Sequence, residues 1–180
     1  MGVLKIIRHT DANPQYLCNA INYILHGHTD PDNIGSPNTC IYDVYDQMYA
    51  VKKYYGKTGG NPLFHFVVIY DARTAYDVNR AKYLTARIAD YFAERYQIIW
   101  CVHEKALSKR YGKISSLYHA HFVMNSVSFV DGKMYSNDRA EIYYRLLEYI
   151  KSVTGDRTWI VDYNCSNGKP VIEDDNGFFG

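Results

Sequence analysis

Two histidines, His119 and His121, stand two residues apart in a segment rich in β-branched and aromatic side chains, from Tyr118 to Phe129. This composition is typical of a β-strand. Because successive side chains of a strand point to opposite faces, His119, His121 and Asn125 are expected on one face. Two imidazoles side by side on a sheet surface can both bind one divalent metal ion.

A third histidine is a candidate ligand for the same ion. His103 follows the apolar run Gln97 to Val102, and if that run is an antiparallel neighbour of the first strand, His103 reaches the histidine pair. The alternative is that these are half-exposed strand histidines without a ligand. The third histidine and the nearby Asn125, which could orient a phosphate, favour a metal site.

Three segments together resemble one protein family. The run from His119 to Lys133 resembles the metal motif of the relaxases, the mobilisation nucleases of plasmids and conjugative transposons, which carry a histidine–hydrophobic–histidine signature. The segment 19–24 resembles the family's first motif, whose tyrosine is the nucleophile. The segment 52–60, followed by Phe64 and His65, resembles the link into its second motif.

This resemblance covers roughly residues 15 to 135 and implies roles for single residues. Tyr23 would attack a DNA phosphodiester, join the 5′ end of the cut strand as a phosphotyrosine and release a 3′-hydroxyl. His65 and Asn125 would be further catalytic residues. Without the resemblance, Tyr23 and His65 would be taken as packing residues, and Asn125 as a hydrogen-bonding partner between strands.

Two features depart from the family pattern. His103 and His119 are sixteen residues apart, further than is usual in the family. Ile69 and Tyr70 stand where the family usually has a Ser-Phe pair. The long connection does no harm if His103 still faces the pair, whereas the missing serine suggests altered DNA contacts or weaker activity.

The resemblance also implies a cofactor and partners. Three neutral imidazoles leave coordination positions open for phosphate oxygens and water, which suits Mg²⁺ or Mn²⁺ in the cell. Imidazole by itself prefers Zn²⁺ or Ni²⁺, so the identity of the ion stays open. The expected partners are single-stranded DNA at a transfer origin and the accessory and coupling proteins of the relaxosome.

The charge of the chain gives little support to DNA binding. The net charge is only +1; five acidic and two basic residues after residue 155 leave +4 for the rest. Four basic residues between His103 and His119 are the predicted phosphate contacts, although an ordinary solvated loop would explain them as well. They are Lys105, Lys109, Arg110 and Lys113.

Other features of the composition bear on base stacking, disulfides and location in the cell. The 19 tyrosines could stack on unpaired bases, but most are expected to pack in or near the core. The four widely spaced cysteines predict free thiols rather than disulfides. The sequence has no signal-peptide pattern and no apolar run long enough to cross a bilayer. We therefore expect a cytoplasmic protein without membrane insertion.

Periodicity and turn residues predict the elements that must position these residues. Helices are expected over Gln15–Leu25, Cys40–Tyr55, Thr74–Arg95 and about Asn137–Val153, and strands over Val3–Ile7 (an edge strand), Leu63–Tyr70, Gln97–Val102 and Tyr118–Val130, with Lys133–Tyr135 pairing back. This order predicts an α+β fold with an open antiparallel sheet and helices packed mainly on one face. Residues 1–155 would form a relaxase-like nuclease domain, followed by a loose, polar and acidic extension over residues 156–180.

The expected function is therefore that of a DNA relaxase, which nicks one strand at a transfer origin to start conjugative mobilisation. A rolling-circle replication initiator shares the histidine pair, but its tyrosine generally follows the histidines, whereas Tyr23 precedes them. The main alternative is a degenerate, non-catalytic relaxase-like module that binds DNA or a transfer protein. The near-neutral charge and Ile69 are the features that favour this alternative.

Overall fold

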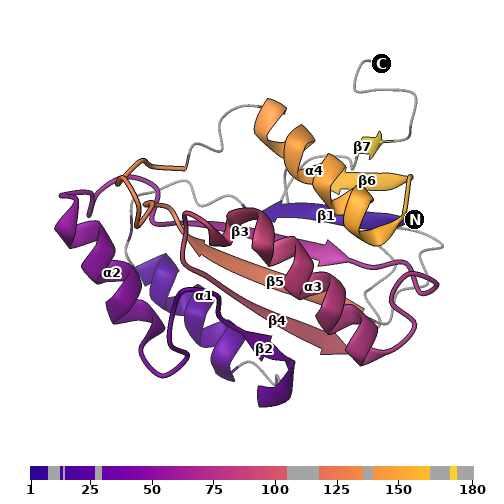
Figure 1. Ribbon diagram of the computed structural model, residues 1–180, viewed down its shortest axis with the longest axis horizontal. Coiled ribbons are helices and arrows are strands. Elements are labelled where there is room, and N and C mark those ends of the chain that lie inside the picture. The colour runs from indigo at the N-terminus through magenta and orange to yellow at the C-terminus, as the bar shows by residue number, and fades with distance from the viewer. Residues whose placement is uncertain are drawn as a thin grey trace.

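The structure, a computed structural model, describes residues 1–7, 13, 15–26, 30–104, 118–135, 140–162 and 171–173. Over these residues, seven strands form one open sheet in the order β2-β4-β5-β3-β1-β6-β7 (Figure 1). The strands are β1 (Gly2–Ile7), β2 (Ile34–Gly35), β3 (Leu63–Ile69), β4 (Ile98–Glu104), β5 (Tyr118–Asn125), β6 (Trp159–Asp162) and β7 (Val171–Glu173). The helices are α1 (Gln15–His26), α2 (Val44–Tyr54), α3 (Val78–Ala93) and α4 (Ala140–Thr154), with a 3₁₀ turn at Pro31–Asn33.

The predicted α+β class and open sheet are confirmed, but one strand pair runs in parallel. β4, β5, β3 and β1 are successive antiparallel neighbours, whereas β1 and β6 are parallel. The sheet is therefore mixed. None of the described helices has the length and hydrophobicity that crossing a bilayer requires.

Each face of the sheet carries two helices, which differs from the expectation of helices mainly on one face. One core cluster packs α3 and α4 against the sheet, and in Figure 1 both helices cross in front of it. Its members include Phe66, Phe122, Leu84, Ile88 and Leu146. A second cluster packs α1 and α2 against the opposite face, and its members include Leu17, Ile21, Met48, Ile99 and Val123. The periodicity of a helix shows which of its sides is apolar but not which face of a sheet it covers.

Several predicted boundaries differ from the observed ones. α3 begins at Val78 rather than at Thr74, since the Asp77 side chain accepts a hydrogen bond from the Arg80 backbone N–H at 2.7 Å and caps the helix there. β5 ends at Asn125. The segment expected to pair back does so through a single bridge between Val127 and Met134.

The expectations for the two ends of the described chain are wrong. β1 is not an edge strand, because it lies between β3 and β6. Trp159–Asp162, expected in a loose extension, form β6 instead. The fully buried Trp159 belongs to the larger core, and its ring covers Gly2, where an added Cβ would lie 2.6 Å from the ring. Pairing with a strand far away in sequence decided both outcomes.

We therefore expect Trp159→Ala to lower the free energy of unfolding by about 3–5 kcal/mol, because it leaves a large cavity in the core. Urea unfolding followed by circular dichroism measures the change. The control is Tyr42→Ala, which removes a side chain that is 91% exposed and should cost no more than about 0.5 kcal/mol. Equal costs for the two variants would show that β6 does not stabilise the domain.

Candidate metal centre and nucleophile

The pairing of β4 with β5 brings the three predicted metal-ligand histidines together. His103 lies directly opposite His119, and His121 lies opposite Cys101. Each of the three imidazoles offers one nitrogen, and these nitrogens all lie within 4.8 Å of one another. The sixteen-residue separation of His103 and His119 is therefore no obstacle, because the antiparallel register and not the connection decides where they meet.

The three histidines, called the triad below, sit in a site that disfavours positive charge. His119 is buried, while His103 and His121 are half-buried. Burial, the neighbouring imidazoles of His119, His65 and His103, and the Lys5 ammonium lower the pKa of His121 to about 2. His121 is therefore neutral near pH 7, which is the protonation state that binds a metal ion.

The geometry of the triad fits a divalent ion. Two nitrogens that bind one zinc-sized ion at about 2.1 Å lie roughly 3–4 Å apart, so small side-chain rotations would close the triad around it. Within the described residues, Nδ1 of His121 is buried and makes no hydrogen bond. A buried polar atom without a partner is costly, and a bound ion or an ordered water molecule would relieve that cost.

Tyr23, the predicted nucleophile, stands at the edge of the triad. The apolar side of α1, formed by Leu17, Ala20, Ile21 and Ile24, packs on the sheet and fixes the helix over β4 and β5. The Tyr23 ring centroid lies 5.1 Å from that of His121 and 5.7 Å from that of His103. Its side chain is 47% exposed, so it can meet a molecule from solvent. Partial burial, and then Cys101, raise its pKa, so the hydroxyl keeps its proton near pH 7.

His65 lies beside the triad, whereas Asn125 does not. The buried His65, on β3, has its ring centroid 6.0 Å from that of His121. Asn125 lies four residues beyond His121, about 13 Å along the strand. Its side-chain amide donates to the Met48 carbonyl at 3.0 Å and to Gln97 Oε1 at 2.9 Å, and its Oδ1 accepts from the Val127 backbone N–H. These contacts favour a structural role for Asn125, the alternative that the sequence left open.

Sequence reasoning missed one neighbour of the triad. Cys101 is buried on the same face, and its Sγ lies 3.5 Å from Nε2 of His103. Counting back two residues along the strand from His103 would have placed it there. Ile69 lies opposite His119 and is buried, so an apolar side chain borders the triad where the family usually has a serine. The predicted phosphate contacts Lys105, Lys109, Arg110 and Lys113 lie outside the described residues.

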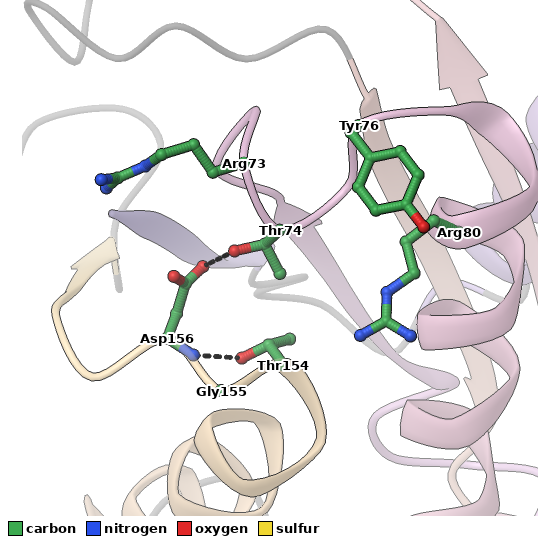
Figure 2. Close-up of a pocket in the computed structure, with 7 residues that line it drawn as sticks. All are labelled: Arg73, Thr74, Tyr76, Arg80, Thr154, Gly155 and Asp156. Atoms are coloured by element: carbon green, nitrogen blue, oxygen red, sulfur yellow. Dashed lines mark hydrogen bonds between the residues drawn. The ribbon is translucent and has the colours of Figure 1, made fainter.

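A separate hollow of about 570 Å³ opens between the β3–α3 loop and the α4–β6 loop (Figure 2). Its lining residues are Arg73, Thr74, Tyr76, Arg80, Thr154, Gly155 and Asp156. The Thr74 hydroxyl donates to the Asp156 carboxylate at 2.6 Å, which ties the two loops together. None of the predicted site residues that the structure describes lines this hollow, so the triad and the hollow are distinct.

Comparison with known protein families identifies the family of this chain. The family model described as "Relaxase: MobA/VirD2-like, nuclease domain" matches residues 16–159, a range that contains Tyr23, His65 and the whole triad. No significant match is found among curated proteins or among solved structures. Since the matched range is most of the chain, the protein belongs to the relaxase family and comprises its MobA/VirD2-like nuclease domain.

Proposed function

We propose that this domain is an active, metal-dependent relaxase that nicks one DNA strand at a transfer origin for conjugative mobilisation. The observation that carries the proposal is the position of a solvent-accessible Tyr23 ring against two of three clustered histidines. Membership of the relaxase family supports single-stranded DNA as the substrate. Relaxosome accessory and coupling proteins are the proposed partners.

His103, His119 and His121 would hold the metal ion. When bound, a divalent ion polarises the scissile phosphate and offsets the negative charge that develops during cleavage. The neutral state of His121 supports this role, because its lone pair does not have to be freed from a proton. We propose Mg²⁺ or Mn²⁺ as the ion in the cell, and Zn²⁺ or Ni²⁺ as ions that the imidazoles also bind in vitro.

Tyr23 would supply the covalent step. Its hydroxyl oxygen attacks the phosphorus, a new P–O bond forms to the tyrosine, and the P–O3′ bond breaks. The 3′-oxygen leaves as a hydroxyl group with the proton that Tyr23 loses. The reverse attack by the 3′-hydroxyl rejoins the strand without a nucleotide cofactor, because the phosphotyrosine conserves the energy of the bond.

The remaining predicted residues enter this proposal in different ways. His65 would act as a positioning residue that packs beside His121. The basic residues of the β4–β5 connection would hold DNA phosphates, a role proposed from their charge alone. Asn125 is left out of the chemistry, because its hydrogen bonds hold β5 to α2 and to the start of β4.

Metal binding can be tested by thermal unfolding with Mn²⁺, Mg²⁺ and Ni²⁺. An ion that binds only the folded domain should stabilise it by about 2.7 kcal/mol at a concentration one hundred times its Kd. This gain should disappear in His119→Ala/His121→Ala. His26→Ala is the matched control, since His26 is exposed at the end of α1 and is not part of the triad. No gain with any of the ions would contradict the metal centre.

The nucleophile can be tested by trapping the covalent adduct. Wild-type protein, single-stranded origin DNA of the parent element and Mn²⁺ should give an SDS-stable protein–DNA adduct, and Tyr23→Phe should give none. The ring and its contacts with the triad are kept in this variant, so its metal-induced stabilisation should equal that of the wild type. Tyr16→Phe on the same helix should retain the adduct. An adduct that survives in Tyr23→Phe would assign the attack to another residue.

Acid should destabilise the metal-free domain through His121. The unfolded imidazole takes up a proton below about pH 6.5, whereas the folded one, with its pKa lowered to about 2, does not. The contribution of His121 is thus fully present above pH 6.5 and is lost as the pH falls. From pH 7 to pH 5 this lowers the free energy of unfolding by about 2 kcal/mol.

Urea unfolding in a metal chelator at the two pH values measures this loss. In His121→Gln the side chain no longer titrates, so the difference between pH 7 and pH 5 should shrink by about 2 kcal/mol. His26→Gln is the control and should keep the full difference. An equal pH dependence in wild type and His121→Gln would mean that His121 accepts a proton in the folded domain.

A further inference from the structure

A strip of aromatic and basic side chains runs along α2. Tyr45 and Tyr49 are one helical turn apart, and their rings stack at 5.8 Å between centroids with an interplanar angle of 8°. One turn further along, Lys53 holds its Nζ 5.6 Å from the centroid of the Tyr49 ring. Since residues four apart share one side of a helix, these three residues form one continuous surface, called the α2 strip below.

The α2 strip lies next to the helix that carries Tyr23. Tyr45 packs against the core cluster that α1 and α2 build together. α1 and α2 are in direct contact, and burial, followed by the neighbouring Tyr49, Cys18 and Asp46, raises the pKa of Tyr45. Cys18 and Tyr23 are five residues apart, about 7.5 Å along α1.

The composition of the strip suits unpaired nucleic acid better than a purely structural role. A tyrosine pair one turn apart would stabilise a helix by only a few tenths of a kcal/mol. Tyr45 and Tyr49 are half-buried and Lys53 is exposed, so flat rings and a cation are offered to solvent together. Proteins that bind single strands combine aromatic stacking with positive charge in this way. Asp43 and Asp46 stand at the start of α2, so a phosphate would be favoured at the Lys53 end.

We propose that Tyr45 and Tyr49 form a stacking platform for unpaired bases of the DNA strand that Tyr23 cuts, with Lys53 holding a phosphate. This inference rests on the proposed relaxase function. The triad and α1 lie on the same face of the sheet as α2. A strand bound at the triad therefore reaches the platform without crossing the sheet.

The opposite face of the sheet offers a matched pair of side chains. On α3, the Arg80 guanidinium lies 5.4 Å from the centroid of the Tyr83 ring, and Tyr83 is 56% exposed. Arg80 also lines the hollow of Figure 2. α3 packs on the face away from the triad. This pair has similar chemistry to the α2 strip but lies on the face of the sheet away from Tyr23, which makes it the control.

The test is the binding of a fluorescent oligothymidylate of about 12 nucleotides, a length within the range that single-strand binding modules cover, measured by anisotropy. Tyr45→Leu/Tyr49→Leu keeps apolar side chains on α2 but removes both rings. We expect its Kd to rise about 5- to 150-fold for each stacked base that is lost. Lys53→Gln should lower the slope of log affinity against log salt by about 0.7. Tyr83→Leu/Arg80→Gln should bind like the wild type.

Unchanged affinity in the α2 variants, an equal loss in the α3 variant, or no binding by the wild type would each overturn the platform. Thermal unfolding of every variant, with and without Mn²⁺, verifies that the fold and the triad are intact. The adduct assay keeps the two proposals apart. Binding that depends on α2 without any adduct would retain the platform and refute the nuclease. An adduct together with binding that does not depend on α2 would retain the nuclease and refute the platform.

Discussion

The antiparallel register between β4 and β5 is the constraint on which the candidate site depends. It sets His103 opposite His119 and puts His121 two residues along on the same face. A slip of one residue would turn one strand's side chains to the other face and separate the ligands. The register is well fixed, because Trp100 and Phe122, which alternate with the site residues, are buried in the core under α3 and α4. The larger core thus supports the triad from the opposite face of the sheet.

On the other face, α1 completes the candidate active site by placing Tyr23 at the triad. Its apolar side packs on β4 and β5, and Tyr23, next to that side, meets the triad while remaining accessible. α2 packs beside α1 and is tied down by polar groups. Lys52 donates to the Ser126 hydroxyl at 2.6 Å, and burial lowers the pKa of its ammonium to about 8. Such buried polar bonds fix an element in one position, because leaving a partner unsatisfied is costly.

The electrostatics of the domain are local. A net charge of +1 gives no strong general attraction to DNA, so affinity has to come from particular contacts. Such contacts would come from the triad with a bound metal ion, from the α2 strip and from the basic residues between His103 and His119. Burial and the neighbouring imidazoles keep His121 neutral, which favours metal binding and at the same time would make the metal-free domain sensitive to acid.

The sequence by itself determined the local features: four helices, the main strands, the pair His119 and His121 on one face, and the family. Periodicity and motif order carry this information, because they depend on neighbours in the chain. Only the tertiary structure decided the rest. It put β1 inside the sheet, brought Trp159 into the core, divided the helices between the two faces and engaged Asn125 in structural bonds. The physical reason is that strand pairing and helix docking depend on contacts between residues far apart in sequence, which local patterns do not encode.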